Sequence, residues 1–338
     1  MFNRKINILV TGAKGQLGSY LVNYFKDKSF KEKSKIGKVF GIDIEDLDIR
    51  NASDVADFFN KNVVDPPVKL DYVIHCAAAT DTAAIEEDPS KFYAVNCLGP
   101  KNIAQSCAYN KIKMIFISTD YVMSEFSGTY SWKLQEFPVN QYGLQKLIAE
   151  QFVKEAYKDK PKDCMILRSS WMFGNSDKSF VEKFLANAFK MYAANTHEKK
   201  IEVPVANDAY GRPTPTWFIA DTIEHLILNN MHGTIDLQYP FKQISRYDWA
   251  KMIWNAFVSD RCMDSKMSTL VNALKDSIEV VPKSSAEIGV QMHHPGKVGD
   301  GIGLEDGRHT YAQDTMDYMH KNWQKLIKIA NSIINGAK

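Results

Sequence analysis

The sequence predicts an α/β protein whose first part is a doubly wound parallel sheet and whose second part is a smaller, mixed α/β domain. Short apolar runs rich in β-branched residues alternate with amphipathic stretches of helix length through the first half of the chain. The runs are apolar on both faces, as in parallel strands that crossover helices cover from two sides. After about residue 168 this rhythm gives way to a mixture of short strands and helices.

The elements of the first part alternate as strand and helix along the chain. We expect strands at residues 6–11, 38–43, 72–76, 114–118 and 165–168, and helices at 16–26, 53–60, 89–109 and 141–157. In the second part we expect strands at 201–204 and 234–237, and helices at 180–192, 217–228, 246–257 and 311–334. We divide the chain into domains 1–170 and 171–338, with a segment at about 205–230 packing back on the first domain.

Composition excludes several classes of protein. With 338 residues, 45% of them hydrophobic and 24% charged, the chain can form two globular cores without metal or disulfide support. A net charge of +2 gives no strong basic field for nucleic acid or an anionic membrane. No apolar run reaches the roughly 18 residues of a membrane span, and the five cysteines form no C-x-x-C pair. We therefore expect a cytoplasmic protein with reduced thiols and with neither membrane nor nucleic-acid partners.

A glycine-rich turn, TGAKGQLG at residues 11–18, follows the first expected strand and opens the first expected helix. Its glycines fall at i, i+3 and i+6, which differs from the G-x-G-x-x-G spacing of many dinucleotide sites. The physical demand is similar, because a tight turn lets the backbone approach a pyrophosphate and the helix amides point toward it. The turn between strand and helix therefore predicts a dinucleotide site.

The end of the second expected strand carries Asp43. A carboxylate at this place can bind the 2′-hydroxyl of a ribose and disfavours a 2′-phosphate. Lys14 in the glycine-rich turn could instead bind that phosphate, so NAD and NADP both remain open as the cofactor. A polar residue at a strand end can also serve only the turn that follows.

Three side chains have the chemistry of carbonyl reduction. Tyr142 and Lys146 are four residues apart and share a face of the expected helix at 141–157. A tyrosine pKa near 10 is high for acid–base work at neutral pH, and a nearby ammonium group should lower it. Thr119, at the end of the preceding strand, could donate a hydrogen bond to the carbonyl. Tyr-x-x-x-Lys alone is common by chance, but the glycine-rich turn and this hydroxyl make the set a candidate active site.

The chain resembles the extended short-chain dehydrogenases/reductases and, within them, the dTDP-4-dehydrorhamnose reductase family. The matching stretches are collinear over about residues 5–230. They are TGAKGQLG at 11–18, LDI at 47–49, HCAAA at 75–79, YAVN at 93–96, STDYV at 118–122, YGLQK at 142–146, RSSW at 168–171 and NDAYGRPT at 207–214. STDYV and the G-x-P-T loop narrow the resemblance from the superfamily to the family.

The resemblance implies a Rossmann-type first domain and the NADPH- or NADH-dependent reduction of the 4-keto group of a nucleotide-activated 6-deoxy sugar. Tyr142 would supply the proton, Lys146 would hold the nicotinamide ribose and tune Tyr142, and Thr119 would polarise the ketone. The cofactor would contact Gly12, Lys14, Gly15, Gln16, Leu17, Gly18, Asp43, Asp48, Ile49, Ala77, Ala78, Ala79, Asn96, Tyr142 and Lys146. The substrate would contact Asp120, Tyr121, Trp171 and Arg212. Taken alone, Trp171 is more often a core residue than a ligand contact.

Two regions depart from the family pattern. The loop 80–84 is one residue shorter than in the family, and the family's C-terminal substrate segment is replaced by HHPGK at 293–297. That replacement lies in a loop, residues 289–307, which holds six of the chain's 18 glycines. Both regions contact substrate in the family, so the sugar and the nucleotide base are left open. In the same loop, Lys297 and Arg308 could clamp a diphosphate or simply be solvated.

We expect no metal site. The position of the family's magnesium-binding glutamate is Tyr20 here, and the pair His293 and His294 has no further ligand at suitable spacing. A homodimer is left open.

Two other functions are compatible with these residues. A 4-epimerase would use the same three side chains and retain its cofactor. The regulatory β-subunit of methionine adenosyltransferase resembles the same family but acts as a binding partner. A 4,6-dehydratase is disfavoured, because Tyr121 stands where such an enzyme has a glutamate, and a GDP-fucose-type epimerase–reductase is disfavoured because Asp120 stands where that enzyme has a cysteine.

Overall fold

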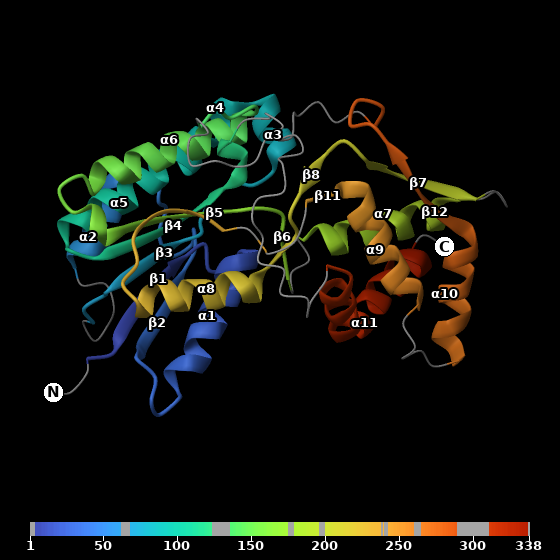
Figure 1. Cartoon of the computed structure of the whole chain (residues 1–338), viewed down its shortest axis with the longest axis horizontal. Coiled ribbons are helices and arrows are strands. Elements are labelled where there is room, and N and C mark those ends of the chain that lie inside the picture. The colour runs from blue at the N-terminus through green and yellow to red at the C-terminus, as the bar shows by residue number, and fades with distance from the viewer. Residues whose placement is uncertain are drawn as a thin grey trace.

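The structure is a computed structural model that describes residues 4–61, 68–123, 136–174, 179–195, 200–237, 239, 243–259, 265–288 and 311–336. A large parallel sheet with its covering helices forms one side of the molecule, and a group of helices around a small sheet forms the other (Figure 1). Among the described residues, no helix has both the length and the apolar character needed to cross a membrane.

The large sheet has six strands in the order β10-β5-β4-β3-β1-β2, and every neighbouring pair is parallel. β2 pairs with one edge of β1, and β3, the next strand along the chain, pairs with the other edge. The carboxyl ends of β1 and β3 therefore form a topological switch point, where open α/β sheets bind their ligands. The strands are β1 (Ile6–Thr11), β2 (Ile36–Ile42), β3 (Tyr72–His75), β4 (Lys113–Thr119), β5 (Cys164–Ser169) and β10 (Gly233–Asp236).

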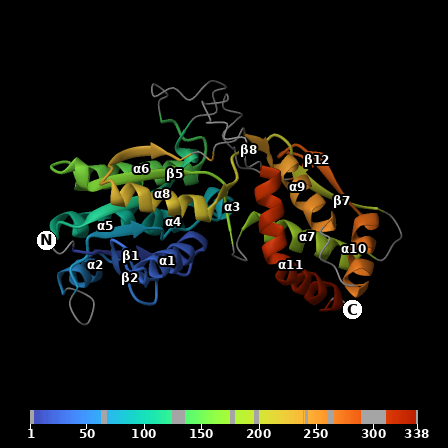
Figure 2. The ribbon, with the colours of Figure 1, turned by 60° about the horizontal axis from the view of Figure 1, so that its bottom comes forward.

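Helices cover both faces of this sheet (Figure 2). One layer consists of α1 (Gln16–Ser29) and α8 (Thr216–Leu228), and the other of α2 (Ala52–Asn60), α5 (Gly99–Tyr109) and α6 (Gln141–Ala156). Because side chains alternate along a strand, Ile8 and Val10 of β1 pack in the core beneath α1 and α8, whereas Leu9 packs in the core beneath α2, α5 and α6. All three side chains are almost fully buried.

After the loop that follows β3, residues 82–98 are mostly helical but irregular. They include α3 (Thr82–Glu87), α4 (Pro89–Tyr93) and a π-helical turn, Ala94–Leu98, which leads directly into α5. Asp81 and Asp88 cap the two short helices by accepting backbone N–H groups. The π-helical turn carries Asn96, and such turns are frequent at functional sites.

The second core lies among α7 (Phe180–Ala194), α9 (Arg246–Ser259), α10 (Ser265–Ser277), α11 (Tyr311–Gly336) and the parallel pair of β7 (Ile201–Ala206) with β12 (Ile278–Lys283). Its large side chains include Trp249 and Phe257, which are completely buried. Two further sheets have only two strands each. They pair β8 (Tyr210–Gly211) with β11 (Ile244–Ser245), and β6 (Met172–Phe173) with β9 (Thr214–Pro215).

The α/β prediction and its Rossmann-type sheet are confirmed, with most element ends within three residues of the expected ones. The single helix expected at 89–109 is divided into three segments, and α3, α10, β12 and the two-residue strands were not predicted. The division at residue 170 stays a prediction. Both α8 and β10 follow that residue in sequence yet pack on the large sheet. The expectations for Cys262, His293, His294, Lys297, Arg308 and loop 289–307 lie outside the described residues.

Candidate active site

The glycine-rich turn brings the ends of β1 and β3 into direct contact. Gly12 has a φ of +68°, and a Cβ added there would lie 2.7 Å from the backbone nitrogen of Ala77. A Cβ on Gly18 would lie 2.1 Å from the carbonyl oxygen of Gly12. Glycine is therefore required at both positions for steric reasons, and the first also for its left-handed backbone. Gly12, Lys14 and Gly15 of the turn, which precede α1, face the cavity at the switch point.

A cavity of about 500 Å³ opens at this place. Its size and position fit a dinucleotide, and the bare glycines let the chain approach a pyrophosphate closely. It brings together nine of the predicted cofactor residues: Gly12, Lys14, Gly15, Asp43, Asp48, Ile49, Ala77, Ala78 and Ala79. Sequence reasoning missed other lining residues, among them Arg50, Phe92 and Val95. Of these, Arg50 and Val95 carried a signal, since Arg50 follows the LDI stretch directly and Val95 lies within the YAVN stretch.

Three predicted cofactor residues lie elsewhere. Gln16 donates a hydrogen bond from Nε2 to the carbonyl of Met172, at 3.2 Å. Leu17 is buried in the core beneath α1. Gly18 packs against the turn that precedes it. These positions support the shape of the turn, and none of them lines the cavity.

The ribose end of the cavity is rich in acidic side chains. Asp43 accepts a hydrogen bond from the backbone nitrogen of Lys14 at 2.7 Å, and the Lys14 ammonium pairs with Glu45 at 2.9 Å. The Glu45 carboxylate raises the pKa of Lys14. Asp48, expected at the adenine, pairs with Arg50 at 2.7 Å. Lys14, the residue that could bind a 2′-phosphate, is therefore already paired with Glu45.

Asn96 connects the cavity to α6. Its Oδ1 accepts from the backbone nitrogen of Ala79 at 2.9 Å, and its Nδ2 donates to the Ala79 carbonyl and to Oε1 of Gln145. Asn96 is fully buried, and Gln145 lies between Tyr142 and Lys146 in sequence. The asparagine thus fixes the alanine segment against the helix that carries the predicted catalytic side chains. Sequence reasoning missed Gln145.

Thr119, Tyr142 and Lys146 all lie at the carboxyl edge of the sheet. Thr119 ends β4, and α6 begins just afterwards in space, with Asn140 capping it by accepting from the Gly143 nitrogen at 2.7 Å. A Cβ on Gly143 would lie 2.1 Å from the carbonyl oxygen of Tyr121. The start of α6 therefore packs directly on the turn Asp120–Val122 that follows Thr119. Gly143 belongs to the YGLQK stretch, but the sequence did not predict its close packing on Tyr121.

The electrostatics of Tyr142 differ from the expectation. Burial raises the pKa of Tyr142 above its ordinary value, and Tyr121 and Asp120 raise it further. The predicted lowering by Lys146 is wrong, because the Lys146 ammonium donates instead to the carbonyl of Ile117 at 2.8 Å. It also lies 4.0 Å from the centre of the Phe116 ring. Burial lowers the pKa of Lys146 itself to about 8.

A buried ion-pair network holds α6 to the sheet. Arg168 of β5 donates from Nε and Nη2 to the two carboxylate oxygens of Glu150, at 2.9 and 2.6 Å. Ser118 of β4 donates to the same carboxylate at 2.6 Å, and Arg168 also contacts Glu136 and Asp236. The network positions the helix that carries Tyr142 and Lys146.

Two of the four predicted substrate residues, Asp120 and Arg212, line a small polar cavity of about 20 Å³, the size of one water molecule. Ser170 also lines it, and burial raises the pKa of Asp120 to about 6. Tyr121 meets the ring of Tyr142 edge to face, with centroids 6.1 Å apart. Trp171 lies outside this cavity and has an unusual φ of +34°.

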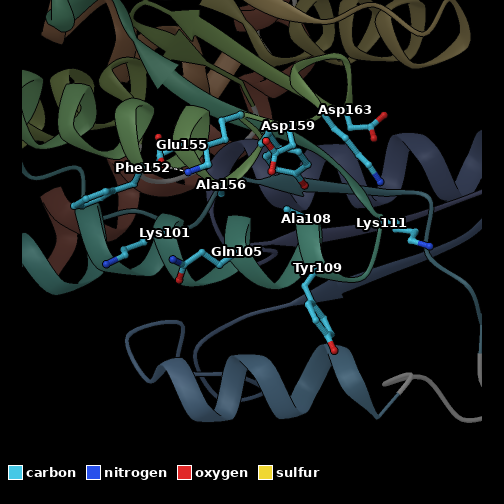
Figure 3. Close-up of a pocket in the computed structure, with 13 residues that line it drawn as sticks. Lys101, Gln105, Ala108, Tyr109, Lys111, Phe152, Glu155, Ala156, Asp159 and Asp163 are labelled. Atoms are coloured by element: carbon cyan, nitrogen blue, oxygen red, sulfur yellow. Dashed lines mark hydrogen bonds and ion pairs between the residues drawn. The ribbon is translucent and has the colours of Figure 1, made fainter.

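A second groove, of about 520 Å³, lies between α5 and α6 at the opposite edge of the sheet (Figure 3). Lys111 and Asp163, which line it, precede β4 and β5, whereas the candidate catalytic residues follow the carboxyl ends of strands. Lys158 pairs there with Glu155 at 2.8 Å. None of the predicted site residues lines this groove.

The parallel sheet, the switch-point cavity and the adjacent Thr119, Tyr142 and Lys146 define a Rossmann-fold protein of the short-chain dehydrogenase/reductase class. Residues 6–295 match the family described as the RmlD substrate binding domain. The chain belongs to this family, as the resemblance of its motifs predicted.

Relatives and solved structures agree with this assignment. The chain is 28% identical over 255 residues to the dTDP-4-dehydrorhamnose reductase of Mycolicibacterium smegmatis, covering 75% of this chain and 70% of that protein. It is 30% identical over 230 residues to a probable low-salt glycan biosynthesis reductase of Haloferax volcanii, covering 67% and 72%. A crystal structure of a dTDP-4-dehydrorhamnose reductase from Clostridium acetobutylicum superposes with a TM-score of 0.73 at 26% identity, over 94% of this chain and 100% of that one.

Proposed function

We propose that the protein is an NAD(P)H-dependent oxidoreductase that reduces the 4-keto group of a nucleotide-activated 6-deoxy sugar, with a dTDP-linked sugar as the first candidate. One observation carries the proposal. In a member of this family, Thr119 ends β4, Lys146 of α6 donates to the Ile117 carbonyl of the same strand, and a cavity that fits a dinucleotide opens at the carboxyl ends of β1 and β3. Relatives in Mycolicibacterium smegmatis and Streptomyces niveus are named as reductases of dTDP-linked sugars.

Each side chain has a defined task in this reaction. A nicotinamide cofactor held in the switch-point cavity would supply the hydride for the keto carbon. Tyr142 donates its phenolic proton to the oxygen of the former ketone, and its raised pKa keeps that proton in place at neutral pH. Thr119 donates a hydrogen bond to the same oxygen while negative charge develops there. Lys146 contributes a positive charge from the same helix.

Two features favour a reductase over the alternatives. Tyr121 follows Asp120 where a 4,6-dehydratase of this fold has a glutamate, so the side chain needed to lose water from the sugar is absent from that position. All three candidate catalytic side chains are present in the chain, and so is the cavity that fits a dinucleotide. A regulatory subunit needs only the binding surfaces, so the retained catalytic side chains favour an enzyme.

The test is turnover of a panel of nucleotide 4-keto-6-deoxy sugars by the purified protein with NADPH or NADH, followed as loss of nicotinamide absorbance. We expect one oxidised cofactor released for each sugar reduced, whereas a 4-epimerase would interconvert sugars without net oxidation. Tyr142→Phe should abolish turnover and retain cofactor binding. Full activity in this variant would refute the proton-donor role, and the absence of turnover on every sugar with tight cofactor binding would favour a regulatory subunit.

A cytoplasmic location rests on sequence reasoning alone and stays a prediction, and whether the protein forms a homodimer stays open. The 4-keto sugar and the reduced nicotinamide are both small soluble compounds, which supports the first. Size measurement in solution tests the second.

A further inference from the structure

Arg246, the first residue of α9, holds a guanidinium group against three aromatic rings. Its central carbon lies 3.5 Å from the centre of the Trp171 ring, 4.4 Å from that of Phe180 and 5.5 Å from that of Trp249. The backbone nitrogen of Arg246 donates to the carbonyl of Ala209 at 2.8 Å, which anchors the residue. Stacking on aromatic faces engages the plane of a guanidinium and leaves the N–H groups at its edge available.

Those N–H groups have no protein acceptor in the described part of the chain. The charges nearest to Arg246 are those of Tyr121 and Asp120, in the turn that follows Thr119. Tyr121 meets the ring of Tyr142 edge to face, so the turn that acts electrostatically on Arg246 also borders the predicted proton donor. Burial lowers the pKa of Arg246 to about 10, and the side chain is still cationic at neutral pH. Arg246 is half-buried, so the edge of its guanidinium is open to a ligand.

The surrounding chain is shaped to hold this stack. Trp171 keeps a φ of +34°, which is unfavourable for a bulky residue. A Cβ on Gly211 would lie 2.3 Å from the Trp171 ring, so only glycine leaves room for it. The rings of Trp171 and Trp249 are stacked 5.8 Å apart. The strained backbone and the close packing of Trp171 indicate that the position of its ring matters for more than filling the core.

We propose that Arg246 binds the diphosphate of the nucleotide sugar, at the phosphate joined to the sugar ring. An arginine fork matches the paired oxygens of a phosphate, and the aromatic stack fixes the fork before the ligand arrives. The keto carbon at Tyr142 and the phosphate at Arg246 would then lie on opposite sides of the same sugar ring. The inference rests on the proposed function and names a specificity residue that its motifs do not include.

The test is isothermal titration of the full-length protein, loaded with oxidised cofactor, with dTDP and with dTMP. We expect Arg246→Met to weaken dTDP binding about 10- to 100-fold and to leave dTMP within about threefold, since dTMP lacks the second phosphate. Arg246→Lys, which keeps the charge but loses the fork, should fall between. Lys251→Met is the matched control, because Lys251 is a cation of the same helix that also lies over an aromatic ring, at 5.7 Å from the centre of Tyr247.

Kinetics separate this inference from the proposed function. On a 4-keto sugar that the wild type reduces, Arg246→Met should raise KM by the same factor as the dTDP dissociation constant while kcat changes less than about threefold. Equal weakening of dTDP and dTMP, or unchanged dTDP binding, overturns the role of Arg246 even if turnover is normal. Loss of the preference for dTDP over dTMP in Arg246→Met, in a variant that melts at the wild-type temperature, supports it even if no sugar of the panel is reduced.

Discussion

A tyrosine that donates a proton during a reduction must be protonated when its substrate arrives, and the surroundings of Tyr142 ensure this. Its pKa is raised by burial, by Tyr121 and by Asp120. The Tyr-x-x-x-Lys spacing correctly predicted a shared helix, but it did not indicate where the lysine side chain would point. Lys146 donates to the Ile117 carbonyl, a contact set by the depth of α6 on β4. Such a rotamer has no signature in sequence, and neither has the stack on Arg246.

Asp120 provides a pH-dependent test of the same environment. Its folded-state pKa is raised to about 6 from 3.8, so the folded protein binds this proton more tightly than the unfolded chain does. Its contribution to stability therefore falls as pH rises from about 4 to about 6. Asp120→Asn should be more stable than wild type at pH 8, by about 1–3 kcal/mol, and should lose this advantage near pH 4. Urea unfolding at the two pH values measures it, and an advantage of equal size at both would contradict the assignment.

Cofactor preference is also decided by single residues. Asp43, Glu45 and Asp46 form an acidic turn at the ribose end of the cavity, and Lys14 is paired with Glu45 at 2.9 Å. We expect NADH to be used better than NADPH, because a 2′-phosphate would meet these carboxylates. Asp43→Ser should reduce the ratio of kcat/KM for NADH over NADPH at least about tenfold, an energy of about 1.4 kcal/mol. Asp57→Ser, an exposed acid on α2, serves as the control. A wild type that prefers NADPH would refute the expectation.

At the scale of elements, the sequence succeeded where the pattern is local. Buried parallel strands produce apolar runs, and these located the five strands that hold the site. The sequence did not predict β12. This strand pairs with β7, with Ile278 opposite Ile201, and the two segments lie far apart in the chain. Pro282 within β12 further weakens any strand signal, although an edge position tolerates it. The break of 89–109 at Ala94–Leu98 was equally invisible, since a π-helical turn keeps the composition of an α-helix.

The contact between α6 and the catalytic turn gives a prediction for an element pair. A Cβ on Gly143 would lie 2.1 Å from the Tyr121 carbonyl oxygen, and backbone on both sides must move to accept it. Gly143→Ala should cost about 1–3 kcal/mol of stability and displace Tyr142 from Thr119, lowering kcat at least about tenfold.

Gly336→Ala is the control for that substitution, because a Cβ at this helical position meets nothing within 4 Å. We expect wild-type melting and turnover for it. If Gly143→Ala behaved in the same way, the close packing of α6 on the turn could not be what positions Tyr142.

At the scale of the whole molecule, the large sheet is completed by segments from beyond residue 170. β10 pairs with β5, and α8 packs beside α1, where Leu21 and Phe25 are completely buried. Four aliphatic side chains of α8 lie in this core: Ile219, Ile223, Leu226 and Ile227. At about 1.5–3 kcal/mol for each buried side chain, their loss removes about 6–12 kcal/mol, which is comparable to the stability of a whole domain.

A pair of fragments tests where the first folding unit ends. Fragment 1–170 contains every residue predicted to bind the cofactor, yet it lacks α8 and β10 and exposes one face and one edge of the sheet. We expect it to aggregate or to melt without a cooperative transition, because its uncovered face and unpaired β5 edge favour association. Fragment 1–237 restores both segments and should melt cooperatively and bind the cofactor, as followed by circular dichroism and titration. Cooperative folding of 1–170 with cofactor affinity equal to that of 1–237 would place the boundary at residue 170 after all, and would make α8 and β10 a covering layer that the nucleotide-binding core does not need.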